Sequence, residues 1–246
     1  MVQNAKFTVQ FKVNSHDTDK NGNVRPSVIL RYFHEAANLQ FESSSTTLDI
    51  LRKEQNKAFL LSRATVELTR QLRAFEKITV RTWAAGGRGA TFYRAGELLA
   101  GDEIVARLVS LWALVDLSDR RLCRVKDTKL DLPTLEEYPL PIPGHLRMPK
   151  GGEEMTLCGK RLVQNSDIDL NCHVNNTNYP DKMSNYIPGI ENKKVCAFTV
   201  SYIHEAPLGA ELSVLHCEEE GVQYIRTLRP DGTVNAEASF VLEDVA

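Results

Sequence analysis

The sequence predicts an α+β fold made of two copies of one unit, each an antiparallel sheet wrapped around a central helix. Three observations predict this architecture. The order of strand, polar loop, apolar helix and run of strands occurs twice along the 246 residues. The polar loop recurs with much of its sequence intact, and a proline-rich segment separates the two occurrences.

The polar loop is the clearest repeat. Residues 167–179 read DIDLNCHVNNTNY, and residues 17–24, DTDKNGNV, overlay the first eight of these positions at a constant shift of 150 with four identities. Asp and Asn favour turns and helix N-caps, so a loop that leads into a helix is the structural interpretation of either copy. The recurrence favours a duplicated unit.

Later segments follow the same duplication. At a shift of 134, Val66, Leu68 and Ile78 match Val200, Tyr202 and Leu212, and further on residues 92–94 match residues 224–226. We therefore expect the strands that follow each polar loop to correspond in order.

The two copies differ at the positions that matter for chemistry. Asn23 stands opposite His173, and Gln71 stands opposite Glu205. Both replacements keep polarity and approximate size but remove the titrating group. Only the second copy is therefore expected to carry out acid–base chemistry.

The first half is expected to contain one strand, two helices and four more strands. The segment from Phe7 to Val13 alternates apolar and polar residues, which is typical of a half-buried strand. Pro26 suits the first turn of a helix, and the residues after it are apolar on nearly all sides, as in a buried helix. The expected elements lie at residues 7–13, 27–41, 46–57, 59–69, 78–84, 91–99 and 104–116, with turns at 86–89 and 100–102.

Prolines cluster between the halves and predict an N-terminal domain (1–130), a linker (131–152) and a C-terminal domain (153–246). The second half repeats the order with a shorter helix, at residues 155–163, 180–186, 196–204, 211–218, 222–229 and 233–242. A central helix wrapped by such strands is a hotdog unit, so the expected fold is a tandem, or double, hotdog. A single unit leaves a sheet edge unfinished, which makes covalent pairing physically sensible.

The bulk composition is that of an ordinary soluble globular protein, with 42% hydrophobic and 25% charged residues. A net charge of −2 disfavours nucleic-acid binding. Five cysteines without a C-x-x-C pair argue for free thiols in a reducing compartment and against a zinc site. The N-terminus lacks the apolar core of a signal peptide, and no apolar run approaches the roughly twenty residues of a membrane span. We expect a cytoplasmic protein without membrane contact.

The first polar loop also resembles the opening of a calcium-binding EF-hand. Asp17, Asp19 and Asn21 have the spacing of such a loop, and a glycine follows. The twelfth position should be a bidentate Glu, but it is Val28 in the first copy and Asn178 in the second. We therefore predict no metal site.

The second loop also identifies a family. Asp167-x-Asp169-x-Asn171-x-His173-Val-Asn175-Asn176-x-x-Tyr179, followed about thirty residues later by Tyr202-Ile-His-Glu205, resembles the acyl-acyl-carrier-protein (acyl-ACP) thioesterases of bacteria and plant plastids. The resemblance spans essentially the whole chain. It implies a tandem hotdog that hydrolyses the thioester between a fatty acyl chain and the phosphopantetheine arm of the carrier protein. It thus implies release of free fatty acid, an acyl carrier protein as partner and no cofactor of the enzyme's own.

Carried over to this sequence, the family's catalytic set falls on Asp169, Asn171, His173 and Glu205. Plant members have a cysteine directly after the glutamate, whereas this chain has Ala206, so a covalent mechanism at that place is not available. The absence of a transit peptide suggests a bacterial cytosolic member.

Each of these residues has an expected role. Glu205 serves as the general base or orients the attacking water. Asp169 fixes the imidazole tautomer of His173, although helix capping explains an isolated Asp equally well. Asn171 supplies an amide donor or holds the water. The backbone N–H groups of residues 174–176 point toward a developing oxyanion.

The remaining polar residues of the motif have structural alternatives. Asn175, Asn176 and Tyr179, with Val174, are expected to shape the entrance for the pantetheine arm, and helix capping is an equally economical explanation. Cys172 is expected to pack and not to act as a nucleophile. His204 and His216 are expected to be ordinary surface or strand residues.

Three matters stay open at the level of sequence. An acyl-CoA thioesterase would use the same site, and a non-catalytic acyl-chain sensor is a different class of protein. The chain could work as a single tandem pair or as a homodimer. Acyl-chain length depends on an apolar pocket that we expect in the first half, around its long helix.

Basic residues that could dock an acidic carrier protein are Arg120, Arg121, Arg124, Lys193 and Lys194, although a solvated face explains them too.

Overall fold

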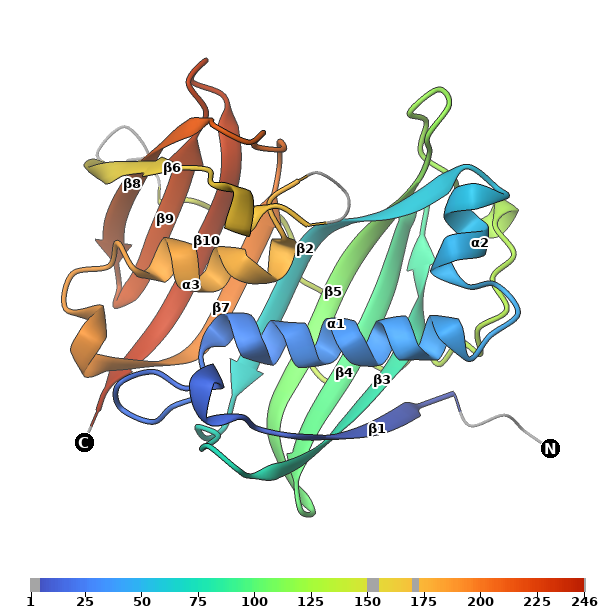
Figure 1. Ribbon diagram of the computed structural model, residues 1–246, viewed down its shortest axis with the longest axis horizontal. Coiled ribbons are helices and arrows are strands. Elements are labelled where there is room, and N and C mark those ends of the chain that lie inside the picture. The colour runs from blue at the N-terminus through green and yellow to red at the C-terminus, as the bar shows by residue number, and fades with distance from the viewer. Residues whose placement is uncertain (1–4, 150–154, 170–172, 246) are drawn as a thin grey trace.

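A computed structural model describes residues 5–149, 155–169 and 173–245 of the chain (Figure 1). Its centre is one antiparallel sheet of ten strands in the order β1-β3-β4-β5-β2-β7-β10-β9-β8-β6. The first half contributes β1 (Phe7–Lys12), β2 (Lys57–Leu68), β3 (Lys77–Arg88), β4 (Thr91–Ala100) and β5 (Glu103–Asp116). The second half contributes β6 (Thr156–Leu162), β7 (Lys193–Tyr202), β8 (Glu211–Glu219), β9 (Val222–Leu228) and β10 (Val234–Asp244).

Each half therefore has the same strand order, and the two halves meet edge to edge through β2 and β7. Thr65 pairs with Thr199 across this junction, and their hydroxyl oxygens lie 2.9 Å apart. Thr199 is also the residue that the shift of 134 assigns to Thr65. A pseudo-twofold axis thus passes between these two residues, and the double hotdog is confirmed.

The long helix of the first half lies in front of β3, β4 and β5, as Figure 1 shows. This helix is α1 (Pro26–Glu42), and the shorter α2 (Leu48–Lys53) follows it. Pro26 occupies the first helical turn, where its missing N–H costs nothing. Gly96 of β4 allows a close approach, because a Cβ atom there would lie 2.8 Å from the ring of Phe33.

The second half has only a short helix at the same place, α3 (Tyr179–Ser184), preceded by the 3₁₀ turn Asn176–Asn178. Asp181 of α3 reaches across to α1, where the Ser27 N–H donates to Asp181 Oδ1 at 2.8 Å. Arg25, the N-cap residue of α1, provides no side-chain cap, so Asp181 caps α1 from the other half. Burial raises the pKa of the Asp181 carboxyl, and the hydrogen bonds from Ser27, which lower this pKa, offset only part of that effect.

One hydrophobic core runs through both halves. Phe33 and Leu108 from the first half belong to the same buried cluster as Phe198 and Phe240 from the second. The two halves therefore share their interior as well as their sheet.

The proline-rich connector packs against the sheet of the first half. The Leu135 N–H donates to Ala84 O at 2.9 Å, and the Tyr138 hydroxyl donates to Ala85 O at 2.7 Å. Trp83 Nε1 donates to Glu137 O at 3.0 Å, and Leu140 is buried. The connector thus covers a face of the sheet, while its limits as a domain boundary stay a prediction.

The structure corrects two sequence-based expectations. Gly86 and Gly87 do not separate strands, because β3 continues to Arg88: Gly86 lies in a β-bulge, and Gly87 pairs with Phe92. The match of residues 92–94 with 224–226 is also wrong. Thr82 of β3 pairs with Gly96 of β4. Its counterpart His216 of β8 pairs with Ile225 of β9, so β4 and β9 correspond at a shift of 129. The reason is a longer β3–β4 hairpin, with 13 residues between the paired positions instead of 8.

Among the described residues, no helix is long and apolar enough to cross a membrane.

Candidate active site

The polar loop of the second half is anchored by a buried carboxylate. Asp167 is 1% exposed, and its side chain accepts hydrogen bonds from Arg161 Nη2 at 2.7 Å, from Lys182 Nζ and from the Gln164 N–H at 3.0 Å. Burial alone would raise the pKa of this carboxyl, but the hydrogen bonds from Lys182, Gln164 and Arg161 together lower it. Asp167 is therefore held as an anion beneath the loop.

Backbone hydrogen bonds close the loop. The Asp169 N–H donates to His173 O at 2.9 Å, and the Asn175 N–H donates to Asp167 O at 2.9 Å. The first loop makes the same two bonds at the shift of 150, from Asp19 to Asn23 at 2.8 Å and from Arg25 to Asp17 at 3.1 Å. The predicted repeat of the two loops is confirmed.

The two titrating residues that distinguish the second half lie together. His173 Nε2 is 2.9 Å from Glu205 Oε2, and the two side chains are 41% and 57% exposed. A small reactant from solvent can therefore reach both. In the first half Asn23 is buried, and Gln71 Nε2 turns away to donate to Val195 O at 2.7 Å. The contact is a property of the second half alone.

A buried asparagine that the sequence analysis did not identify connects the two segments of the site. Asn235 is 1% exposed, and its Nδ2 donates to His204 O at 2.5 Å and to the Tyr179 hydroxyl at 3.1 Å. The backbone carbonyl of Asn235 accepts hydrogen bonds from the N–H groups of Ile203 and His204, both at 3.0 Å. Asn235 thereby fixes the turn that carries Glu205 to the end of the polar loop.

The repeat contained a signal for this asparagine. The Thr69 N–H donates to Val105 O at 3.0 Å in the first half, as the Ile203 N–H does to Asn235 O in the second. Val105 is therefore the counterpart of Asn235. Replacement of a valine by an asparagine at a buried strand position is a change that packing alone does not favour.

The residues expected at the pantetheine entrance have other contacts. Tyr179 is buried, and its ring packs edge to face on Tyr202 with the centroids 5.3 Å apart. Val174 is buried too. Asn175 caps the following turn, because its Oδ1 accepts the Thr177 N–H at 2.9 Å, and Asn176 O accepts the Tyr202 hydroxyl at 2.8 Å. These contacts favour the structural alternative, and substrate binding by the four residues stays a prediction.

The backbone hydrogen bonds reduce the number of N–H groups that could donate to an oxyanion. The N–H of Asn175 is already bonded to Asp167 O, so it does not face a reacting group. The N–H groups of Val174 and Asn176 donate to no backbone acceptor within the described residues. Their counterparts differ: the Val24 N–H donates to Leu72 O at 3.0 Å, and Pro26 has no N–H. Val174 and Asn176 thus remain as the candidate donors.

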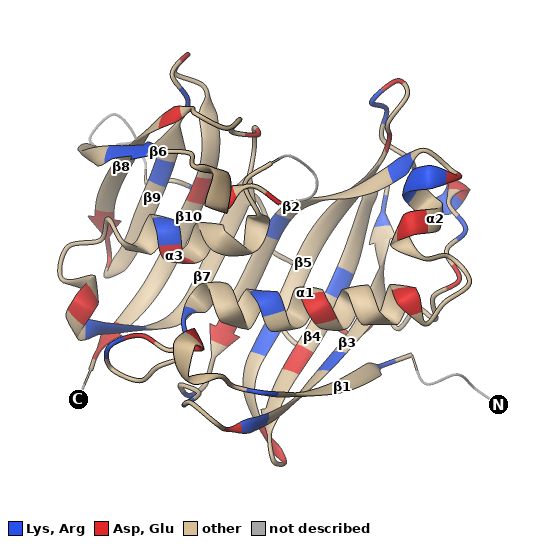
Figure 2. Ribbon diagram, viewed as in Figure 1, with Lys and Arg blue, Asp and Glu red and all other residues tan. Residues whose placement is uncertain are grey.

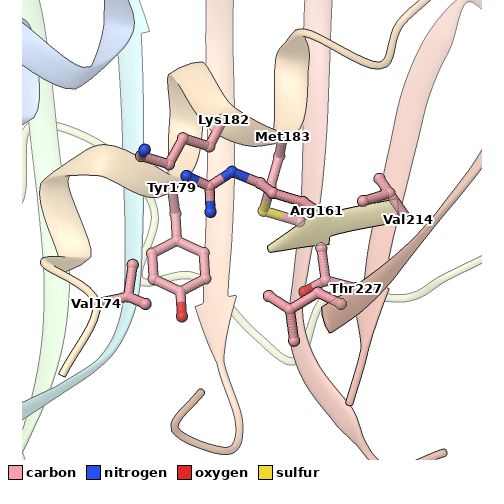
Figure 3. Close-up of a pocket in the computed structure, with 8 residues that line it drawn as sticks. Arg161, Val174, Tyr179, Lys182, Met183, Val214 and Thr227 are labelled. Carbon is pink, nitrogen blue, oxygen red and sulfur yellow. The ribbon is translucent and has the colours of Figure 1, made fainter. Parts of the chain in front are cut away.

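Beneath the loop lies a cavity with room for about one water molecule, with a volume of about 20 Å³ (Figure 3). Arg161 and Lys182 extend side by side along it above Tyr179 in Figure 3. Its lining consists of Arg161, Val174, Tyr179, Lys182, Met183, Leu212, Val214 and Thr227. This cavity is far too small for an acyl chain.

Other predicted residues fall outside this arrangement. Asn171 and Cys172 lie outside the described residues. His204 Nδ1 is 2.8 Å from Val234 O, and His216 Nε2 is 2.7 Å from Gln223 Oε1, so both have ordinary strand contacts. Among the described residues, no group of three His, Cys, Asp or Glu side chains could hold a metal ion.

The basic residues considered for carrier docking are partly occupied by acidic partners. Lys193 Nζ is 2.6 Å from Asp244 Oδ1, and Lys194 Nζ is 2.9 Å from Glu243 Oε2. Figure 2 shows acidic and basic residues interspersed over both halves in this view. Docking through these residues stays a prediction.

Comparisons with known proteins agree with this picture. A family model described as the acyl-ACP thioesterase N-terminal domain matches residues 4–132, and one described as the acyl-ACP thioesterase C-terminal domain matches residues 156–241. No curated protein sequence matches.

Two solved structures share the fold over nearly the full length of both chains. An acyl-ACP thioesterase from Bacteroides thetaiotaomicron has a TM-score of 0.88 at 22% identity and covers 98% of each chain. The 12:0-ACP thioesterase from Umbellularia californica has a TM-score of 0.82 at 16% identity and covers 100% of each chain.

Proposed function

Because this chain belongs to the acyl-ACP thioesterase family and is a thioester hydrolase that acts on acyl-ACP, we propose that its substrates are fatty acyl-ACPs and that it releases free fatty acid to terminate fatty acid synthesis. The observation that carries this proposal is the 2.9 Å contact between His173 and Glu205 in one half only. A pair of titrating groups open to solvent is suited to activating a water molecule.

In the proposed reaction, Glu205 accepts a proton from water as the water oxygen attacks the thioester carbonyl carbon. His173 shares that proton through its contact with Glu205, and Asp169 orients the imidazole. The N–H groups of Val174 and Asn176 stabilise the oxyanion, a role worth about a hundredfold in rate for one donor. Collapse of the intermediate breaks the C–S bond, and the pantetheine thiolate leaves with little proton assistance because thiols are acidic.

The acyl chain is proposed to enter the first half, along α1. The cavity under the catalytic loop of the second half holds about one water molecule, so it cannot hold an acyl chain. The start of α1 lies against the 3₁₀ turn that follows the catalytic loop. We infer that an acyl chain whose thioester lies at His173 and Glu205 extends along α1, which lies in front of β3, β4 and β5 (Figure 1).

Hydrolysis of a panel of acyl-ACP and acyl-CoA thioesters tests this proposal. We expect free fatty acid from acyl-ACP, with a loss of at least a hundredfold in kcat for His173→Ala and for Glu205→Gln. His204→Ala is the matched control, because His204 adjoins Glu205 but bonds a strand carbonyl. Preference for acyl-CoA would change the substrate class. Inactivity on every thioester together with tight acyl binding would instead indicate a sensor.

A further inference from the structure

The interior of the first half contains a buried arginine without a counter-charge. Arg94 is 7% exposed on β4, and its Nη1 donates to Gln40 Oε1 at 2.7 Å and to Thr82 Oγ1 at 3.1 Å. Its guanidinium carbon lies 5.5 Å from the ring centroid of Phe41. No acidic partner is present among the described residues. Burial lowers the pKa of Arg94 to about 10, so the side chain stays charged at neutral pH.

One buried polar atom near this charge has no hydrogen-bond partner among the described residues. A guanidinium carries five N–H donors, yet within the described residues both side-chain hydrogen bonds of Arg94 come from Nη1. His34 Nε2 is buried with no hydrogen-bond partner there. Burial, together with the charge of Arg94, lowers the pKa of His34 to about 4, so the imidazole is neutral. Buried polar groups are almost always paired, so His34 Nε2 is suited to bind a polar atom of a ligand.

The corresponding position of the second half has no such deficit. At the shift of 129 the counterpart of Arg94 is Gln223. Gln223 Oε1 lies 2.7 Å from His216 Nε2, and its Nε2 donates to Glu218 Oε2 at 2.7 Å. The buried arginine and the unpartnered nitrogen of His34 are therefore features of the half in which the acyl chain is proposed to bind.

Aromatic rings line the approach to Arg94. Phe59 packs against Phe92 and Trp112, with centroids 5.3 and 6.5 Å away, and Trp112 packs against His34 at 5.3 Å. His34, Phe59 and Trp112 are partly exposed, whereas Phe92 and Arg94 are buried. Phe59 also packs against Phe41, with the centroids 5.7 Å apart, and Phe41 is the ring beside the Arg94 guanidinium, so the aromatic cluster extends from partly exposed side chains to the charge.

The distance from the catalytic loop suits an acyl chain. His34 lies eight residues along α1 from Pro26 and Gln40 lies fourteen residues along, which is about 12 and about 21 Å at 1.5 Å per residue. The first turn of α1 is bonded to α3, the short helix that follows the catalytic loop, through Ser27 and Asp181. Arg94, which bonds Gln40, therefore sits where the distal part of a bound chain would arrive.

A purely structural role explains only part of this arrangement. The last turn of α1 has no basic residue, and a cation near that end favours the helix dipole. This accounts for a positive charge beside Gln40. It does not account for the unused donors of Arg94 or for the unpaired nitrogen of His34.

On the premise of the proposed function, we propose that Arg94 and His34 bind an oxygen atom on the distal part of the acyl chain, so that the preferred substrates are oxygenated acyl chains, hydroxy or keto. The oxygen accepts a hydrogen bond from the unused guanidinium N–H groups, and a hydroxyl also bonds His34 Nε2. A plain methyl end leaves these groups unpaired.

The test compares kcat/KM for pairs of acyl-ACPs of equal chain length, with and without a hydroxyl or keto group near the methyl end. We expect the full-length wild type to prefer the oxygenated member by about tenfold to a hundredfold at one chain length, the range for a hydrogen bond to a charged group. Arg94→Met abolishes or reverses this ratio, and Arg94→Lys keeps part of it. Arg226→Met is the matched control, because Arg226 is half-buried and paired with Glu237 at 2.6 Å.

Equal hydrolysis of both members by the wild type, or a ratio that Arg94→Met leaves unchanged, overturns the inference and leaves Arg94 as a stabiliser of α1 whose spare donors bind water. If Arg94→Met does not fold, the wild-type ratio and Arg94→Lys decide. If the wild type hydrolyses no acyl-ACP, the proposed function fails. Calorimetric binding of plain and hydroxylated fatty acids to the wild type and Arg94→Lys then tests the cluster by itself, and equal affinities overturn it.

Discussion

At the scale of single residues, Asn235 shows how a duplicated fold acquires a site in one copy. Its backbone carbonyl accepts a hydrogen bond from the Ile203 N–H, as the backbone carbonyl of Val105 accepts one from the Thr69 N–H in the first half. Its side chain adds bonds to His204 O, the Tyr179 hydroxyl and Thr227 Oγ1. The backbone framework is thus shared, and the added amide fixes the two segments that carry Glu205 and His173.

Substitution of Asn235 by Val, the residue of the first half, should lower kcat by about tenfold to a hundredfold, since small displacements of catalytic groups have effects of this size. KM should change little, because the acyl chain is proposed to bind in the other half. The lost hydrogen bonds should also lower the unfolding free energy by about 1–3 kcal/mol. Thr227→Val is the control: it removes one bond to Asn235 but neither contact with the site, so stability falls and kcat stays. A wild-type kcat in Asn235→Val would refute the positioning role.

Asp167 and Asp17 offer a second matched pair, because they occupy the same position of the two loops. Asp167 bonds two cations, whereas Asp17 bonds Asn14 Nδ2 at 2.9 Å and the Tyr32 hydroxyl at 3.4 Å. Asp167→Asn should cost about 3 kcal/mol of stability, because it removes the buried anion that pairs with two partly buried cations, and should lower kcat. Asp17→Asn should cost about 1 kcal/mol and leave kcat unchanged. Denaturant unfolding and steady-state kinetics measure both effects, and equal losses of kcat would contradict the assignment.

The stability difference for Asp167 should depend on pH in one direction. Its folded pKa is lowered, so its ionised form stabilises the fold. That contribution is fully present above the unfolded pKa and is lost as the pH falls through the lower folded value. The gap in unfolding free energy between wild type and Asp167→Asn should therefore be constant near neutrality and shrink only below the ordinary carboxyl range. A gap that widens in acid would show that the pairing is misassigned.

At the scale of elements, the sequence predicts most strands and helices because their patterns are strong. The alternation of residues 7–13 and the apolar surface of residues 27–41 correspond to β1 and α1 within one or two residues. The β3–β4 hairpin was misread because glycines mark turns and bulges alike. The same error in the hairpin aligned Arg94 with Arg226 and not with Gln223. The sequence therefore did not indicate that the Arg94 side chain is buried beside α1.

The packing of α1 on β4 depends on Gly96, and Gly96→Ala should lower the unfolding free energy by about 1–3 kcal/mol through overpacking. A methyl group there would meet the Phe33 ring at 2.8 Å and Arg81 O at 3.2 Å, and backbone cannot yield. Gly144→Ala is the control, because nothing lies within 4 Å of its added Cβ. Thermal unfolding checks both variants. Addition of Phe33→Leu to Gly96→Ala should restore part of the loss, and a neutral Gly96→Ala would refute the close approach.

At the scale of the whole molecule, the site could be predicted only in part. Identity between the loops revealed the duplication, and the Asn23/His173 and Gln71/Glu205 differences selected the second half. The 2.9 Å contact of His173 and Glu205 joins residues 32 positions apart, and only the family resemblance, not local sequence, placed the two residues in one site. Bonds made by Asn235 and the burial of Tyr179 also depend on how β10 meets the catalytic loop, which local sequence does not specify.

The shared sheet and core should make the two halves unfold as one unit. β2 and β7 pair over five residues, Thr65 meets Thr199 at the axis, and the main core cluster draws side chains from both halves. Exposing either half would therefore also expose the interior and a sheet edge of the other. We expect a single calorimetric transition with equal van't Hoff and calorimetric enthalpies. Thr65→Pro, which removes a strand N–H at the junction, should lower the midpoint of that transition. Two resolved transitions in the wild type would show instead that each hotdog is stable alone, and that the junction aligns two independent domains.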